Sequence, residues 1–162
     1  MSNYFLEIQK GNFVASEKNK VNNVNLKIEN QGEIISLLGP SGIGKTTILR
    51  TLAGLQKLSS GKIFLKGKLI SSNDVHIEPE KRNIALSFQD NSLFPNYTVI
   101  ENINFGKKRA NGNGSPVDTR EIISILHIEP KLEKYPHQIS AGEAQRVSLA
   151  RSLMSKPDLL LL

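Results

Sequence analysis

The sequence predicts an α/β fold with an antiparallel β subdomain near its start and a helical insertion in its middle. Runs that alternate apolar and polar residues, typical of half-buried strands, occupy the first part of the chain. A short and mostly apolar run at residues 33–38 is followed by a glycine-rich turn and a helical pattern. Four consecutive leucines at residues 159–162 predict one more buried strand, so we expect an α/β core that is incomplete at its C-terminal end.

Composition limits the kinds of protein that this chain can be. Its 162 residues are 38% hydrophobic and 22% charged, which suits one soluble domain with a real core. No apolar run reaches the roughly 18 residues that a membrane-spanning helix needs. The first ten residues lack the basic and apolar regions of a secretory signal. The chain has no cysteine, which excludes disulfides and thiolate metal sites and is consistent with a cytosolic protein.

The net charge of +6 permits an anionic partner. Basic proteins bind nucleic acid, anionic membrane surfaces or phosphorylated ligands. Lysine and arginine are scattered here, however, and the densest run covers only residues 107–109. A solvated basic surface is therefore the simpler interpretation of the charge.

The predicted strands and helices alternate with turns along the whole chain. We expect strands at residues 4–8 and 24–28 around a polar turn at 18–23, then a strand at 33–38 and a helix at 46–55. A hairpin around Gly67 joins strands at 63–65 and 69–70, and another strand covers 84–88. Residues from about 90 to 138 form the helical insertion, with helices at 98–105 and 120–128. Ser140 caps a helix that runs to about residue 155.

Residues 39–46 match the phosphate-loop pattern G-x-x-x-x-G-K-[ST] in full. Glycines let successive backbone N–H groups turn toward phosphate oxygens, and the following helix adds the positive end of its dipole. Lys45 would neutralise the β- and γ-phosphates, and the Thr46 hydroxyl would ligate Mg²⁺. The pattern thus predicts a P-loop NTPase core, and alone it does not choose among kinases, GTPases and transport ATPases. The alternative, a plain glycine turn before a helix, leaves Lys45 unexplained. The predicted nucleotide-binding residues, which bind ATP if the chain is an ATPase, are Gly39, Pro40, Ser41, Gly42, Ile43, Gly44, Lys45, Thr46 and Thr47.

A second anion site is predicted at the start of the helix that Ser140 caps. Ser140 offers a hydroxyl, and Ala141 and Gly142 leave backbone N–H groups open at a helix N-terminus. An ordinary serine-capped amphipathic helix is the alternative. Residues 139–147 resemble the signature of the ATP-binding-cassette family, L-S-G-G-Q followed by x-Q-R-V. They depart from it at Ala141 and Glu143.

The resemblance covers essentially the whole chain and implies roles for further residues. Ser140, Ala141, Gly142 and Glu143 would face the ATP that a second subunit holds in a head-to-tail dimer. Gln89 would contact Mg²⁺, which Thr46 also ligates, or the attacking water. Phe13 would stack on adenine, although a buried core position is the alternative. Residues 93–95 and 98–103 would receive helices of a membrane permease, or else form subdomain core.

Residues 79–84, 93–95 and 135–140 look most like importer subunits for ferric iron, polyamines or sulfate, with ferric iron as the first choice of solute. The resemblance implies an ATPase subunit on the cytoplasmic face of the membrane. Such a subunit couples ATP binding and hydrolysis to solute import through permease subunits, and a solute-binding protein takes part indirectly. Chain 1–162 would then be the N-terminal portion of an ATP-binding-cassette nucleotide-binding domain.

The family places an Asp and a catalytic Glu directly after four apolar residues. Here residues 159–162 supply the apolar run, so we expect a truncated chain with no catalytic residue of its own, which binds ATP without turnover. Two alternatives to the importer subunit stay open. One is a nucleotide-binding fragment with no activity, and the other is a soluble cassette protein that acts on nucleic acid or ribosomes. The net charge is the only support for the second alternative, so nucleic acid is the less favoured partner.

Overall fold

The structure, a computed structural model, describes residues 4–14, 20–87, 93–110 and 118–162. It forms two compact units, Met1–Arg82 and Asn83–Leu162. Each unit is described by itself. Among the described residues, no helix is long and apolar enough to span a membrane.

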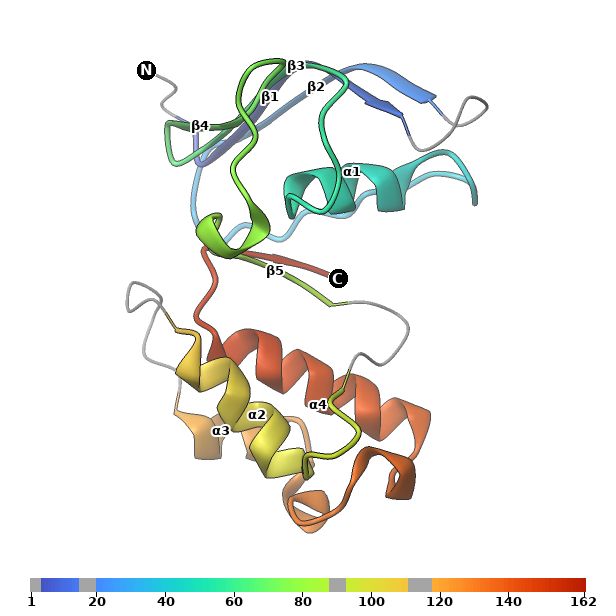
Figure 1. Ribbon diagram of the computed structural model, residues 1–162, viewed down its shortest axis with the longest axis vertical. Helices are drawn as coiled ribbons and strands as arrows, with labels where there is room; N and C mark the ends of the chain where they lie inside the picture. Colours follow the sequence, from blue (N-terminus) through green and yellow to red (C-terminus); the bar gives the residue numbers. More distant parts are fainter. Residues whose placement is uncertain (1–3, 15–19, 88–92, 111–117) are drawn as a thin grey trace. The chain divides into compact units, whose positions relative to one another are not determined.

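The first unit contains a four-stranded antiparallel sheet and one helix (Figure 1). The strands β1 (Leu6–Val14), β2 (Lys20–Ile28), β3 (Ser60–Leu65) and β4 (Lys68–Ser71) lie in the order β2-β1-β3-β4. In the register, Leu6 lies opposite both Ile28 and Leu65, and Ile8 lies opposite Ile63. These apolar residues are all buried, so they define the inner face of the sheet. Helix α1 (Lys45–Leu52) packs against β1 and buries Ile48 and Leu52.

The turn predicted at residues 18–23 is wrong from Lys20 onward, because β2 already pairs with β1 there. Asparagine side chains make this polar strand possible. The Asn23 amide donates to Asn12 Oδ1 at 2.8 Å, and the Lys10 amide donates to Asn25 Oδ1 at 3.0 Å. These bonds satisfy backbone groups where the β1–β2 register shifts at a bulge. The polar residues from Lys20 to Asn23 therefore predicted a turn, whereas asparagine side chains support a strand there.

The predicted hairpin between β3 and β4 is confirmed. Lys66 and Gly67 both have left-handed backbone conformations, with φ of 50° and 73°. A two-residue turn with positive φ at both positions matches the right-handed twist of the strands, which is why glycine is favoured there.

The central strand predicted at residues 33–38 does not form in this structure. The described strands of the unit Met1–Arg82 pair only among themselves, and this segment is not one of them. Ile34 is 95% exposed and Leu38 is 89% exposed. A strand requires a neighbour for its N–H and C=O groups, so the apolar run alone does not make one.

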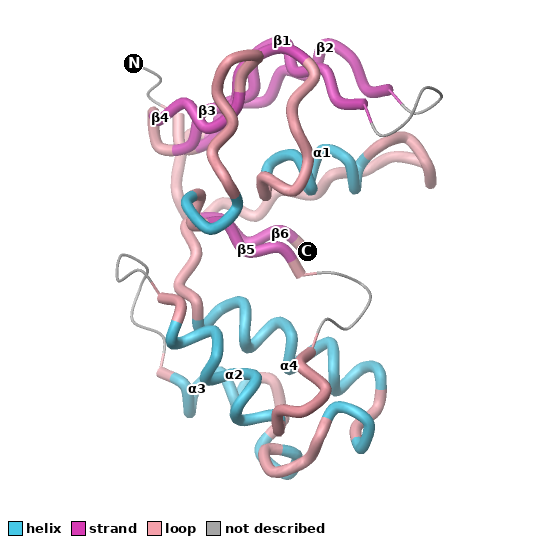
Figure 2. Tube along the Cα trace, in the orientation of Figure 1, coloured by secondary structure: helices cyan, strands magenta, loops and turns pink. Residues whose placement is uncertain are grey.

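The second unit combines a parallel strand pair with a helical cluster (Figure 2). Strands β5 (Ile84–Leu86) and β6 (Leu159–Leu161) form where the short apolar runs predicted strands, and they pair in parallel. The helices are α2 (Val99–Lys108), α3 (Thr119–Ile125) and α4 (Ala141–Met154). Short 3₁₀ turns occur at Pro79–Lys81 in the first unit and at Glu129–Lys131 and Pro136–Gln138 in the second.

The core of the second unit lies between its helices. Helices α2 and α4 approach so closely that a Cβ on Gly106 would collide with the Arg151 carbonyl oxygen. The buried apolar residues come from all three helices and the segments that join them: Leu93, Val99, Ile103, Ile122, Ile123, Ile128, Ala144, Val147, Ala150 and Met154. This packing makes α2 and α4 one compact body within the unit.

Arg82 fixes the far end of α1 in the first unit. It is 3% exposed, and its Nη1 donates to the carbonyl oxygens of Thr51 and Leu52 at 2.8 and 3.0 Å. Its Nη2 donates to Ser71 Oγ at 2.9 Å, and its Nε donates to the Ile77 carbonyl oxygen. Burial lowers the pKa of Arg82 to about 10, so the side chain stays charged at neutral pH. Helix α1 thus ends on a buried cation.

We expect Arg82→Met to lower the free energy of unfolding by about 2–4 kcal/mol, because four acceptors lose their donors at a buried site. Chemical denaturation followed by circular dichroism measures the change. Lys81→Met is the matched control, since it removes the same charge from the exposed neighbouring residue. An equal loss in both variants would show that net charge, and not the buried hydrogen bonds, is responsible.

Candidate phosphate-binding loop and signature helix

The glycine-rich loop joins the segment 33–38 to α1 and is held open by its glycines. Gly42 and Gly44 have left-handed backbones, with φ of 81° and 106°. A Cβ on Gly44 would also collide with the Val21 side chain, so the loop approaches β2 closely there. Residues 39–43 are exposed. The sequence pattern therefore produces a solvent-open loop of the expected backbone type.

Lys45 lies over this loop. Its Nζ donates to the carbonyl oxygens of Gly39 and Pro40 at 2.7 and 2.9 Å. The ammonium group is thereby held at the loop, where the phosphates of a nucleotide would lie. The structure brings together the predicted cation and the first two residues of the predicted loop.

The N-terminus of α1 has no side-chain cap. Its N-cap residue is Gly44, which has no side chain to accept a hydrogen bond from the first turn. The amides of Lys45, Thr46 and Thr47 thus belong to the group of helix donors that require an external acceptor. An anion satisfies them and also interacts favourably with the helix dipole. Together with Lys45, this end of α1 is suited to bind phosphate.

Thr46 and Thr47 differ in what they can offer. Thr46 is exposed beside the loop, so its hydroxyl is open to a hydrated cation such as Mg²⁺. The Thr47 residue is only 7% exposed, which leaves its backbone N–H as its contribution to an anion site. The donor set at this end of α1 therefore fits a magnesium–phosphate group.

The signature helix α4 begins differently, because side chains satisfy its first turn. Ser140 Oγ accepts from the Glu143 amide at 3.3 Å, and Glu143 Oε2 accepts from the Ser140 amide at 2.7 Å. Lys131 Nζ lies 3.2 Å from Glu143 Oε1. The hydrogen bond from the Ser140 backbone, followed by that from Lys131, lowers the pKa of Glu143. Glu143 therefore turns back onto its own helix.

Ala141 and Gly142 remain exposed beside this capped turn. A Cβ on Gly142 would meet only the Arg146 guanidinium, at 3.9 Å, so the surface over Gly142 is open. The sequence already held the signal for the cap, since Ser140-x-x-Glu143 has the spacing of a capping box. The sequence held no such signal for Lys131, because its contact with Glu143 depends on the position of the 3₁₀ turn that carries Lys131.

A groove of about 440 Å³ runs along α2. Thr98 caps this helix in a capping box with Glu101, and the buried Asn102 side chain bonds the carbonyl oxygens of Phe94, Tyr97 and Thr98. The Phe94 and Phe105 rings contact each other edge to face at 4.6 Å between their centroids. The groove is lined by Tyr97, Glu101, Asn104, Phe105, Lys107 and Lys108.

Two predicted site residues stand apart from the loop and the signature. Phe13 is fully buried, and an aromatic ring needs an open face to stack on a base. The adenine-stacking role is therefore wrong for Phe13 in this structure, and the alternative of a core phenylalanine is correct. Gln89 lies outside the described residues.

Known proteins match this chain over a range that includes the glycine-rich loop and α4. A sequence profile of the ABC transporter family matches residues 21–162. The spermidine/putrescine import ATP-binding protein PotA of Haemophilus influenzae is 41% identical over 144 residues, which are 88% of this chain and 37% of that protein. The Fe(3+) ions import ATP-binding protein FbpC of Escherichia coli O157:H7 is 39% identical over 159 residues, 97% of this chain and 44% of that protein. The chain spans less than half the length of these curated relatives.

A solved structure shares the fold. It is an ATP-binding cassette in the dimeric, post-hydrolysis state bound to ADP and Pi, and it aligns with a TM-score of 0.76 and 26% identity. The alignment covers 96% of this chain and 72% of that one. The predicted α/β P-loop NTPase fold is confirmed by this likeness.

We expect the stability contributed by Glu143 to depend on pH. A carboxyl group whose pKa is lower in the folded state stabilises the fold above its ordinary pKa, and this contribution is lost as the pH falls through the folded-state pKa. Glu143→Gln should therefore be less stable than the native chain at neutral pH, and the difference should vanish on acidification. Thermal unfolding at stepped pH values measures it. The same pH-dependent difference in Glu133→Gln, which changes an exposed carboxylate nearby, would contradict this assignment.

Proposed function

The chain belongs to the ABC transporter family, and from this membership we propose that it is the ATP-binding subunit of an importer. The subunit couples ATP binding and hydrolysis to solute uptake through a membrane permease, on the cytoplasmic face of the membrane. The observation that carries the proposal is the uncapped start of α1, with Lys45 held over the exposed loop. A side-chain cap there would already occupy the donors that phosphates require.

ATP binding is assigned to the residues of this loop. The backbone amides of residues 42–47 bind phosphate oxygens, and Lys45 exchanges its carbonyl acceptors for the more strongly accepting β- and γ-phosphates. The Thr46 hydroxyl would hold Mg²⁺, with Gln89 as the second ligand that the family resemblance implies, and the ion would supply positive charge to the terminal phosphate. We assign the activation of water to none of the described residues.

The start of α4 is proposed to bind the ATP of a second subunit in a head-to-tail dimer. Ser140 Oγ accepts from the Glu143 amide, and its own hydroxyl hydrogen stays available for a phosphate oxygen. Exposed Gly142 lets that phosphate approach the backbone. The related solved cassette, which is a dimer bound to ADP and Pi, supports a dimeric arrangement.

The groove on α2 is proposed to receive a helix of the permease. Its aromatic residues, Tyr97 and Phe105, offer apolar contact, and Lys107 and Lys108 offer positive charge at one end. An amphipathic helix with an acidic residue at that end complements such a surface. The names of two relatives state different solutes, spermidine/putrescine and Fe(3+). We propose ferric iron as the first solute to test, although no described residue is assigned to solute contact.

We expect Lys45→Ala to weaken MgATP binding by roughly 30-fold to 1,000-fold, because charge-assisted contacts to two phosphates contribute about 2–4 kcal/mol. Isothermal titration calorimetry with the purified chain measures the affinity. Lys57→Ala removes an exposed lysine from the same unit and should leave the affinity unchanged. Unchanged ATP affinity in Lys45→Ala would overturn the assignment of the loop.

We expect Asn104→Arg to block the groove without harming ATP binding. Asn104 is exposed on α2, so the larger side chain fills the groove and leaves the core intact. Co-purification with co-expressed permease subunits of an importer reports docking, and calorimetry reports ATP affinity. Ser124→Arg adds the same charge to an exposed position on α3 and should dock normally. Normal docking of Asn104→Arg would show that the permease binds elsewhere.

A further inference from the structure

The outer face of the four-stranded sheet carries a polar cleft that the proposed function does not use. In the register, Glu7 lies opposite both Lys27 and Phe64, and Gln9 lies opposite Lys62. Because residues paired across strands share a face, these side chains lie on the side opposite the buried Leu6 and Ile8. The phosphate-binding residues are not part of this face.

The cleft has a volume of about 670 Å³, within the usual range for small-molecule sites. The turn at residues 72–74 forms one wall. Ser72 Oγ accepts from the amides of Asp74 and Val75 at 3.2 and 3.1 Å, which fixes that turn. No apolar side chain is among the lining residues, which are Glu7, Gln9, Lys10, Asn25, Lys27, Gly61, Lys62, Ser72, Asn73 and Asp74. A ligand in this cleft therefore meets charged and polar side-chain groups.

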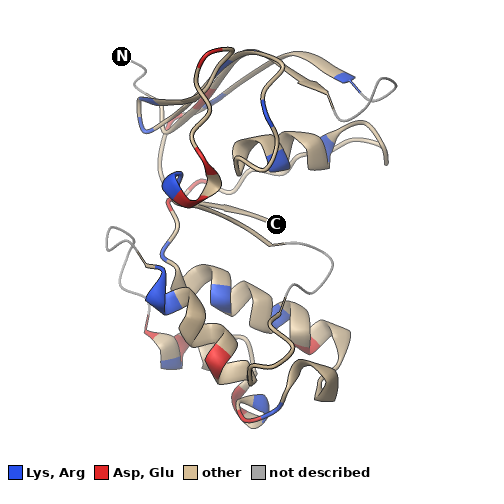
Figure 3. Ribbon diagram, viewed as in Figure 1, with Lys and Arg blue, Asp and Glu red and all other residues tan. Residues whose placement is uncertain are grey.

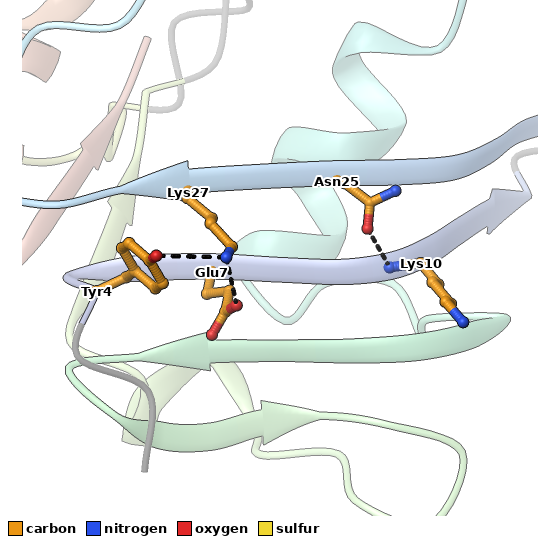
Figure 4. A network of polar contacts seen from close by, with 5 residues as sticks. All are labelled: Tyr4, Glu7, Lys10, Asn25 and Lys27. Carbon is orange, nitrogen blue, oxygen red and sulfur yellow. Dashed lines mark hydrogen bonds and ion pairs between the residues drawn. The ribbon is translucent and has the colours of Figure 1, made fainter.

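The floor of the cleft is electrically balanced. Glu7 is 5% exposed, and its Oε1 lies 3.9 Å from Lys27 Nζ. Lys27 Nζ also donates to Tyr4 Oη at 3.3 Å and lies over the Tyr4 ring (Figure 4). The buried carboxylate thus faces its own cation, and Tyr4 orients that cation. The other lining residues therefore decide which ligand charge the cleft favours.

Lys10 and Lys62 form the cationic end of the cleft. A bulge in β1 gives Lys10 a φ of 48°, and Asn25 Oδ1 holds its amide in that strained conformation. The Lys10 side chain extends from β1 toward β3 (Figure 4). A Cβ on Gly61 would lie 2.5 Å from the Lys10 carbonyl oxygen, so the two strands meet closely beside Lys62. Within residues 4–14, 20–87, 93–110 and 118–162, neither lysine has an ion-pair partner.

The surrounding charge favours an anion. Residues 1–82 carry 12 Lys and Arg against 7 Asp and Glu, which accounts for +5 of the net charge of +6. Figure 3 marks Lys and Arg positions in blue on the ribbon of this unit. Such an excess attracts anionic ligands over distances of about a Debye length.

We propose that this cleft binds a small phosphorylated polyol, such as a sugar phosphate. The phosphate group lies at Lys10 and Lys62, where it meets two cations that lack a described partner. The hydroxyl groups lie at the turn 72–74, where the Asp74 carboxylate accepts their hydrogens and the Asn73 amide adds a donor. The polyol gains hydrogen bonds to Asp74 that inorganic phosphate held at the lysines does not reach, so the cleft favours the phosphorylated polyol.

Calorimetric titration of the purified chain with glucose 6-phosphate tests the proposal, with inorganic phosphate and glucose as separate titrants. We expect glucose 6-phosphate to bind more tightly than either titrant. The double variant Lys10→Gln, Lys62→Gln should bind it at least about tenfold more weakly, because two charge-assisted contacts are lost. The matched control, Lys66→Gln with Lys68→Gln, removes the same charge from the β3–β4 hairpin outside the cleft and should bind normally. Circular dichroism checks the fold of each variant.

Other results would overturn the proposal. These are no binding of glucose 6-phosphate by the native chain, equal weakening in the two double variants, or loss of binding in Lys45→Ala, which would locate the ligand at the phosphate loop. If the Lys10 variant does not fold, Asp74→Asn decides: the preference for glucose 6-phosphate over inorganic phosphate should fall, and an unchanged preference contradicts the proposal. Failure here leaves ATP binding at Lys45 untouched, so the two proposals are tested separately.

Discussion

Burial of the Arg82 guanidinium costs desolvation free energy, and the unit Met1–Arg82 recovers it only when three segments meet at one point. The end of α1 supplies two carbonyl oxygens, β4 supplies Ser71 Oγ, and the chain before Arg82 supplies the Ile77 carbonyl oxygen. Gly54 is part of the same arrangement, since a Cβ there would lie 2.6 Å from Arg82 Nε. Because α1 is only eight residues long, fixing its last turn also fixes the glycine-rich loop at its first.

The two helices that carry the candidate anion sites solve the same problem in opposite ways. Every helix starts with backbone amides that lack partners inside the helix. Helix α4 satisfies two of them with Ser140 and Glu143, whereas α1 has Gly44 at the equivalent position and leaves them open. The open end suits a resident nucleotide, and the capped end suits a surface that meets a phosphate only when another subunit brings it. The residues at the start of each helix therefore suit the two anion sites to different roles.

Features set by a few neighbouring residues were predictable from sequence. Gly67 indicated the hairpin, Ser140 indicated the start of α4, and the glycine-rich loop has the backbone that its spacing requires. Some predictions that depend on distant partners failed. Residues 33–38 have the pattern of a strand but no described neighbour, and β2 is polar yet forms a strand because Asn12 and Asn25 bond across it. Phe13 shows a related limit, because an aromatic at the right spacing gives no sign of whether its ring is covered.

The exposed segment at residues 33–38 affects how the chain behaves in a crowded solution. It combines two isoleucines and two leucines with one charge and no proline, and its backbone groups are unpaired by the described strands. Such a stretch is a template for pairing with a second copy of itself. Folding chaperones that hold exposed apolar segments would compete for it, and so would proteases that cleave extended chain. A neighbouring strand that paired with residues 33–38 would bury them and remove this template, without any change in the stability of either unit.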